Sequence, residues 1–425
     1  MPRIIIPDKP FDIYYRLSTP SKRERAIEID EKYETILFFH PYWLDSFYFY
    51  PQFDDPALYE NYNLICFDAP AHGSTKVKKI SSDPVTWLFF CSLIKDALIT
   101  LNIHSVHLVG STMGCCPAMH FASSYPEMTK TLLMSAPPAP VEATNWSLTF
   151  RECMHILINA VKIRDPEPLD AITSVIFDYN ATSHSGKVIK SIEEEYIQLT
   201  RSRLLSGELN SDKTLPIVIS LALSRKQLLS HEEFLKILND HKIPILIIQG
   251  TNEGWESEEV DDQWLKQMQD IHQLNIDKSG GKSLDNLKRI ILNDVTRWMT
   301  LTSSDILNPI ITKFVSEKTI SKSLYEELNL EIDESKSTEM NIITITKNNH
   351  IRKSSLNNVR KPSFSRDIGV FDDKLFNSLS LNENGKDGNC ASQQTHPSIT
   401  KSPQIRTIPN NEAVKIQVEV ITKVE

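Results

Sequence analysis

The sequence predicts an α/β fold built on a doubly wound, mostly parallel sheet. The first observation is a series of short apolar runs separated by segments with helical periodicity. The second is that such runs stop between residues 141 and 241, where helical segments alone continue. Continuous apolar runs are typical of parallel strands covered on both faces, and their alternation with helices gives an α/β sheet. We therefore expect one sheet that is interrupted by a helical insertion.

Short apolar runs fit buried strands in length and composition. They cover residues 35–40, 63–68, 105–110, 131–135, 244–249 and 287–292. The last two follow the helical insertion, so distant parts of the chain should complete the sheet.

Helices are expected between these strands. Residues 84–101 have apolar residues at helical spacing, with Asp83 as the expected N-cap and Pro84 at the first helical position. Another helix should cover residues 113–124, directly after a strand. Further helical segments are residues 151–162, 192–204 and 305–314. A helical insertion between two strands is most simply a lid over the carboxyl edge of the sheet.

Composition divides the chain into four parts. Residues 1–140 and 242–315 should form the two halves of the core, and residues 141–241 the lid. From residue 316 to 425 the chain is polar and has no tryptophan, so we expect a largely disordered tail that is able to bind a protein partner. Two β-branched stretches in this tail, 341–347 and 414–423, are candidate strands that pair with each other or with a sheet edge.

Charge and cysteine usage exclude several classes of protein. A net charge of −9 and a pI near 5.8 give no electrostatic reason to bind nucleic acid or an anionic membrane. Lys95 and Asp96 interrupt the most apolar helical segment, so no membrane span is expected. The six cysteines show no C-x-x-C spacing, so we expect reduced thiols, no metal site and no cofactor. The N-terminal apolar run is too short for a signal peptide, and a cytoplasmic protein is expected.

Residues 110–114, Gly-Ser-Thr-Met-Gly, follow a predicted strand and begin a predicted helix. This is the pattern of a nucleophile elbow, in which a central side chain stands at the edge of the sheet. Gly110 and Gly114 are expected where strand and helix pass close together. The central residue is Thr112, and its β-branched side chain implies either a relaxed turn or retained strain.

Polar residues follow three other predicted strands. They are His40-Pro41-Tyr42-Trp43, Asp68-Ala69-Pro70-Ala71-His72-Gly73-Ser74 and Thr251-Asn252-Glu253. Together with the elbow, and in this order, these segments resemble the α/β-hydrolase fold superfamily, of the AB hydrolase-1 type, over about residues 30–315. The segments HPYWLDSFYFYPQF and FDAPAHGST resemble a divergent fungal branch of it.

The resemblance implies a nucleophile, an acid and a histidine in that chain order. These positions fall on Thr112, on Glu253 and on Arg297, so a serine and a histidine are both replaced. It also implies Tyr42 and Met113 as donors of the oxyanion-hole N–H groups, with His40 opening that loop. Arg is always protonated and has no acceptor, so Arg297 cannot be the catalytic base. We expect Arg297 to pair with Glu253; the alternative is that it points into solvent.

Other residues near these segments have structural interpretations. His72, His40 and His120 are expected in turns or in the core, and His272 would reach the site only through an unusual loop path. If Ser111 were the nucleophile, Val109 and Met113 would occupy the first and last positions of the motif. Both are larger than the glycines that stand there when Thr112 is the central residue, so this register is sterically less favourable. Cys115 is expected to face the packed interior of its helix.

Three functions remain open from the sequence. The preferred one is a hydrolase-fold protein with a degraded triad and weak or no conventional hydrolase activity. The first alternative is an active, divergent hydrolase that uses Thr112 with a histidine from an unusual position. The second is a ligand-binding or scaffold pseudoenzyme regulated through its tail. In each case the expected ligand is a small apolar or ester-type molecule.

Overall fold

The structure is a computed structural model. It describes residues 2–24, 26–79, 84–139, 144–177, 184–210, 212–223, 240–251, 263, 266, 287–292, 295–319, 330–332 and 342–347. All of them lie in the first of two compact units, Met1–Phe376. The second unit, Asn377–Glu425, lies outside the described residues.

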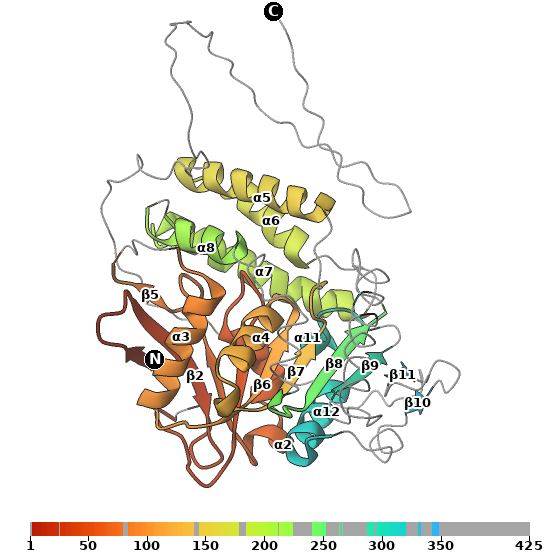
Figure 1. Ribbon diagram of the computed structural model, residues 1–425. Coiled ribbons are helices and arrows are strands. Elements are labelled where there is room, and N and C mark those ends of the chain that lie inside the picture. The colour runs from red at the N-terminus through yellow and green to blue at the C-terminus, as the bar shows by residue number, and fades with distance from the viewer. Residues whose placement is uncertain are drawn as a thin grey trace, which may run out of the picture. The chain divides into compact units, whose positions relative to one another are not determined.

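The described strands form one eleven-stranded sheet in the order β1-β2-β4-β3-β6-β7-β8-β9-β11-β10, with β5 paired to β2 (Figure 1). The strands are β1 (Arg3–Ile5), β2 (Phe11–Ser18), β3 (Thr35–Phe39), β4 (Asn63–Phe67), β5 (Lys76–Val77), β6 (Val106–Ser111), β7 (Thr129–Ser135), β8 (Ile245–Gly250), β9 (Leu287–Leu292), β10 (Leu330–Ile332) and β11 (Ile342–Lys347). From β4 through β11 neighbouring strands are parallel, while β2 and β10 pair antiparallel. The predicted α/β fold with a mostly parallel sheet is confirmed.

The central strands are buried on both faces, as their continuous apolar runs predict. Every residue of β3, β4, β6 and β8 is buried. Because side chains alternate along a strand, β3 supplies Leu37 and Phe39 to one hydrophobic cluster and Ile36 and Phe38 to the other. The sheet is therefore the middle layer of the core.

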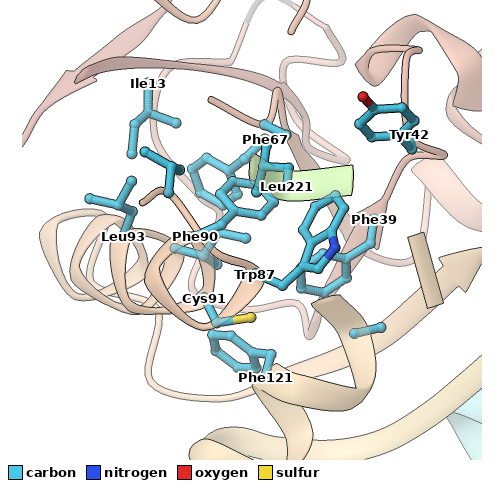
Figure 2. Packing of buried hydrophobic residues seen from close by; sticks show 14 of the residues in the cluster. Ile13, Phe39, Tyr42, Phe67, Trp87, Phe90, Cys91, Leu93, Phe121 and Leu221 are labelled. Atoms are coloured by element: carbon cyan, nitrogen blue, oxygen red, sulfur yellow. The ribbon is translucent and has the colours of Figure 1, made fainter. Parts of the chain in front are cut away.

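Helices cover both faces of the sheet. The first face packs against α3 (Trp87–Thr100) and α4 (Cys115–Ser124), where Trp87, Phe90 and Phe121 meet Phe39 and Phe67 (Figure 2). The second face packs against α12 (Ser304–Glu317) and shorter elements. These are η1 (Ser46–Phe49), α1 (Tyr50–Phe53), α2 (Pro56–Tyr59) and α11 (Met299–Thr302); η2 (Thr112–Gly114) and η3 (Pro126–Met128) flank α4.

The start of α3 differs from the sequence expectation. Its N-cap is Thr86, whose side-chain oxygen accepts a hydrogen bond from the Phe89 N–H at 3.2 Å. Asp83 lies outside the described residues, and Pro84 precedes the helix. The fixed φ of Pro84 would suit the first helical position, but the helix begins later, because the hydroxyl of Thr86 caps it.

Among the described residues, four helices lie between β7 and β8. They are α5 (Thr144–Ile163), α6 (Glu167–Phe177), α7 (His184–Leu205) and α8 (Thr214–Leu223), named here the helical insertion. Figure 1 shows them beyond one edge of the sheet, with α5 outermost. Leu221 of α8 reaches the core near Phe67 and Phe39 (Figure 2). The insertion is thus packed on the sheet rather than separate from it.

β11 extends the sheet beyond β9. Ile342–Lys347 falls within the candidate strand 341–347, and it pairs with β9 in parallel and with β10 antiparallel. Of the two partners that the sequence leaves open, the structure selects the sheet edge. The stretch 414–423 and the remainder of the expected tail lie outside the described residues.

No helix in the described part of the chain has both the length and the hydrophobicity needed to cross a membrane.

Candidate functional site

Thr112 stands where β6 ends at the carboxyl edge of the sheet and turns through η2 into α4. Its φ is +47°, in the left-handed region. A β-branched residue in this conformation is an outlier that costs on the order of 1–3 kcal/mol. Of the two possibilities left open by the sequence, the turn is therefore the strained one.

Gly110 and Gly114 make this turn possible. A Cβ at Gly114 would lie 2.1 Å from the carbonyl oxygen of Phe39 and 2.7 Å from that of His40. A Cβ at Gly110 would lie 2.7 Å from the Cα of Cys115. The elbow thus packs on the end of β3 at one glycine and on its own helix at the other. This is the physical reason for the small residues at both ends of the motif.

Left-handed residues gather at the same edge of the sheet. Trp43 follows β3 with φ +75°, Ala71 follows β4 with φ +62°, and Ala136 follows β7 with φ +49°. Together with Thr112, they strain the ends of neighbouring strands. Strained backbone of this kind clusters at functional sites, so the geometry points to this edge.

His40 and Tyr42 lie in the loop after β3. The Nδ1–H of His40 donates to the carbonyl of Pro41 at 2.9 Å, and its Nε2 accepts the Ala69 N–H at 3.0 Å. Burial lowers the pKa of His40, so the ring stays neutral and connects two loops. The hydroxyl of Tyr42 donates to the carbonyl of Val218 in α8 at 3.0 Å. The oxyanion roles of the Tyr42 and Met113 N–H groups remain predictions.

His72 and His120, which the sequence also singles out, are buried in the structure. His72 donates from Nδ1 to the carbonyl of Pro70 at 2.9 Å, and burial lowers its pKa to about 3. Burial also lowers the pKa of His120, on α4, to about 4. His272 lies outside the described residues. Within the described residues, no hydrogen bond joins a histidine to the Thr112 hydroxyl.

Arg297 and Trp298 occupy the loop after β9, where the resemblance implies a histidine. The Nη2 of Arg297 donates to the carbonyl of Ile176 at 2.7 Å, and the indole N–H of Trp298 donates to the carbonyl of Phe177 at 2.7 Å. Both carbonyls belong to the last turn of α6, where helical donors are missing and a cation is favoured. Arg297 therefore contacts the helical insertion. Glu253 lies outside the described residues, so its pairing with Arg297 stays a prediction.

Three buried hydroxyls lie directly behind the elbow. The hydroxyls of Ser111 and Tyr48 are 2.9 Å apart, those of Ser111 and Thr300 are 3.3 Å apart, and Thr300 also donates to Tyr48. Ser111 and Thr300 are completely buried. Ser111 is thus held inside the core, which argues against it as a nucleophile. Cys115 is equally buried, with its thiol 3.6 Å from the carbonyl oxygen of Ser135.

Two buried carboxylates, Asp45 and Asp68, lie in the loops after β3 and β4. Asp68 accepts hydrogen bonds from the Ser46 N–H at 2.8 Å and the Ser74 N–H at 2.6 Å. Asp45 accepts one from the Tyr196 hydroxyl of α7 at 2.9 Å. Burial and the neighbouring Asp45 raise the pKa of Asp68 to about 7. Among the described residues, no cluster of three His, Cys, Asp or Glu side chains is arranged to hold a metal ion.

Sequence reasoning does not find Tyr48, Thr300, Asp45 or Tyr196. The hydroxyl contacts join residues 63 and 189 positions apart, and the Asp45 contact joins residues 151 positions apart. No local spacing encodes such pairs. The only signal is that Asp45 and Tyr48 fall in the loop that follows a predicted strand.

A family model described as the α/β hydrolase fold matches residues 34–255, just over half of the chain. The chain belongs to the α/β hydrolase fold family. The matched range runs from the start of β3 past the end of β8 and includes the elbow and the helical insertion. Arg297 and the last strands lie beyond it.

Solved structures show the same fold. A thermophilic esterase from Thermogutta terrifontis aligns with a TM-score of 0.54 at 13% identity, covering 75% of this chain and 98% of its own. An α/β hydrolase enzyme from a Medee basin deep-sea metagenome library aligns with a TM-score of 0.53 at 16% identity, covering 75% and 99%. At such identities the likeness extends to the fold alone.

Curated relatives match a shorter stretch. A 2-hydroxy-6-oxononadienedioate/2-hydroxy-6-oxononatrienedioate hydrolase from Comamonas testosteroni is 34% identical over 82 residues, which is 19% of this chain. A 2-hydroxy-6-oxo-6-phenylhexa-2,4-dienoate hydrolase from Burkholderia cepacia is 33% identical over 82 residues. The chain spans 28% of the length of each of these relatives.

The close approach at Gly114 leads to a stability prediction. Gly114→Ala should lower the free energy of unfolding by about 2–4 kcal/mol, because backbone atoms of β3 must move to admit the methyl group. Gly207→Ala is the matched control, since Gly207 has φ +76° but nothing lies within 4 Å of the place that a Cβ would take there. That control should cost about 1 kcal/mol from backbone strain alone. Urea unfolding measures both; equal losses would contradict the contact with β3.

The raised pKa of Asp68 leads to a pH prediction. The pKa of Asp68 is about 7 in the folded chain, against an ordinary value of 3.8. The protonated Asp68 therefore contributes stability to the fold that is fully present below about pH 4 and is lost as the pH rises through about 7. Asp68→Asn removes this titration, so the variant should lose less stability relative to the native chain at pH 8 than at pH 5. The buried histidines act with the opposite sign, but they are common to both proteins and cancel in the difference. Unfolding at both pH values measures it, with exposed Asp54→Asn as control; a difference independent of pH would refute the shift.

Proposed function

We propose that this member of the α/β hydrolase fold family binds a small apolar or ester-type ligand at the Thr112 edge and has weak or no conventional hydrolase activity. The observation that carries the proposal is Arg297. A guanidinium in the loop of the expected histidine has no acceptor for the Thr112 proton. A hydroxyl without an adjacent base is a weak nucleophile.

The surroundings of the site support an apolar ligand. Aromatic rings of Tyr42, Trp43, Phe177 and Trp298 lie in or against the loops at the carboxyl edge, and Phe177 stacks on Trp298 with ring centroids 5.1 Å apart. Aromatic side chains with a few fixed polar groups are typical of sites for small molecules. The helical insertion would then act as a lid over the ligand. We propose Glu253 as the charge partner of Arg297 in this arrangement.

An active, divergent hydrolase is the second candidate. The observation that favours it is the strained φ of Thr112. A nucleophile in an elbow has the same strained backbone, which places its side chain at the edge of the sheet. In this candidate a histidine from a segment outside the described residues supplies the base, and the Tyr42 and Met113 N–H groups form the oxyanion hole. A third role, a ligand-binding or scaffold pseudoenzyme regulated through the tail of residues 316–425, would add a protein partner.

The cysteines support a reducing compartment. The five described cysteines are free thiols, and four of them are buried. Disulfides are rare in the cytosol and common outside it, so we propose a cytoplasmic location.

Activity measurements separate the first two candidates. The native chain should turn over p-nitrophenyl esters at most about 10³–10⁴-fold faster than the uncatalysed reaction, the residual that binding and an oxyanion hole provide without a triad. It should not be labelled by a fluorophosphonate probe. The double change Thr112→Ser with Arg297→His should raise both readouts at least about tenfold, because it restores a nucleophile and a base.

Thr112→Ala is the matched control. It should leave the low native turnover unchanged, because Thr112 does not act as a nucleophile in the proposed function. Robust native turnover that disappears in Thr112→Ala would overturn the proposal in favour of the active hydrolase.

A further inference from the structure

The helical insertion makes side-chain hydrogen bonds to the loops that surround Thr112. From the insertion, the Tyr196 hydroxyl donates to Asp45 at 2.9 Å, and Arg203 Nη2 donates to the carbonyl of Ala71 at 2.7 Å. In the other direction, the indole N–H of Trp43 donates to the Thr173 hydroxyl at 3.2 Å, and Tyr42 donates to Val218. Arg297 and Trp298 add the two bonds to α6.

These bonds reach three separate loops of the carboxyl edge. Tyr42, Trp43 and Asp45 follow β3, Ala71 follows β4, and Arg297 with Trp298 follows β9. On the side of the insertion, α6, α7 and α8 all take part. A segment held at three loops cannot swing about a single hinge without breaking bonds to the other loops. The described contacts therefore fit a closed state of the insertion.

Arg297 makes one of the two bonds that have a charged donor, the other being that of Arg203. The acceptor of the Arg297 bond is a carbonyl in the last turn of α6, where the helix dipole favours a cation. The guanidinium also lies over the Trp298 ring, with its carbon 5.3 Å from the centroid, and Trp298 in turn stacks on Phe177. Arg297, Trp298 and the end of α6 thus form one continuous contact.

We propose that Arg297 holds the helical insertion closed over Thr112, and that release of Arg297 from α6 is required for access to Thr112. In place of a residue that moves protons, this position carries one that controls entry to the site. The inference goes beyond the proposed function and holds whether or not Thr112 is reactive. In the closed state Thr112 is 8% exposed.

The reactivity of a cysteine placed at the elbow tests this access. Thr112→Cys supplies a thiol at the edge of the sheet, and its alkylation rate with iodoacetamide reports how often the insertion opens. Adding Arg297→Ala should raise this rate about tenfold or more, because the loss of a hydrogen bond from a charged donor shifts an opening equilibrium by at least that factor. The same variants with Thr112 retained give the background from native thiols, of which Cys153 is the half-buried one among the described residues.

Two further variants make the test specific. Arg201→Ala is the matched control: it removes an ion pair to Asp170 that joins α7 to α6 within the insertion and touches no loop of the sheet. It should leave the rate unchanged. Tyr196→Phe deletes one hydroxyl from the contact with Asp45 and should raise the rate, so it serves where Arg297→Ala fails to fold.

The outcomes are distinct from those of the activity assay. A faster rate in Arg297→Ala and Tyr196→Phe but not in Arg201→Ala supports the closed insertion. An unchanged rate in a folded Arg297→Ala variant, or an equal rise in Arg201→Ala, overturns it. Neither result depends on ester turnover, so the failure of this inference and the failure of the proposed function are separately visible.

Discussion

The structure of the site depends on the close approach of the β6–α4 turn to the end of β3. A Cβ at Gly114 would meet the Phe39 carbonyl oxygen at 2.1 Å, so only glycine allows the helix to begin against the neighbouring strand. Thr112, two residues before Gly114 in the same turn, has a left-handed φ of +47°. The same contact positions the loop after β3, because the carbonyl oxygen of His40 is the second atom that a Cβ at Gly114 would meet.

A cation in the loop after β9 changes what this edge of the sheet is able to do. An imidazole there would exchange a proton with the elbow hydroxyl, whereas a guanidinium only donates hydrogen bonds. In the structure one of those bonds ends on the last turn of α6, a natural acceptor for a positive charge. We propose that this loop contributes contact with the helical insertion in place of proton transfer.

Several buried polar groups around the elbow bond to one another or to the backbone. The Ser111, Tyr48 and Thr300 hydroxyls bond among themselves, and Asp68 accepts two backbone N–H groups. Such networks are rigid when every member is paired, because an unpaired buried polar group is costly. Strain at Thr112, Trp43 and Ala71 is thus supported by a surrounding structure that leaves these residues few alternatives.

The sequence by itself determined the central strands, the helical insertion and the elbow. Continuous apolar runs identify β3, β4, β6, β7, β8 and β9 because burial on both faces leaves no polar alternation. The strands β1 and β2 are not among those predicted, although β2 is mostly buried. Residues 3–18 contain Pro7 and Pro10 and alternate irregularly, so their strand character depends on pairing with β4 and with each other.

Only the tertiary structure decided which of these residues meet. Arg297 and Ile176 are 121 positions apart, and Trp43 and Thr173 are 130 positions apart, so no spacing in the chain relates them. The close contact at Gly114 is likewise made with β3, which is a neighbour in the sheet and not in the sequence. Local patterns fix which segments are strands and helices, because those depend on nearby residues. Hydrogen bonds between loops depend on how the sheet brings distant strand ends to one edge, and that is a property of the folded chain.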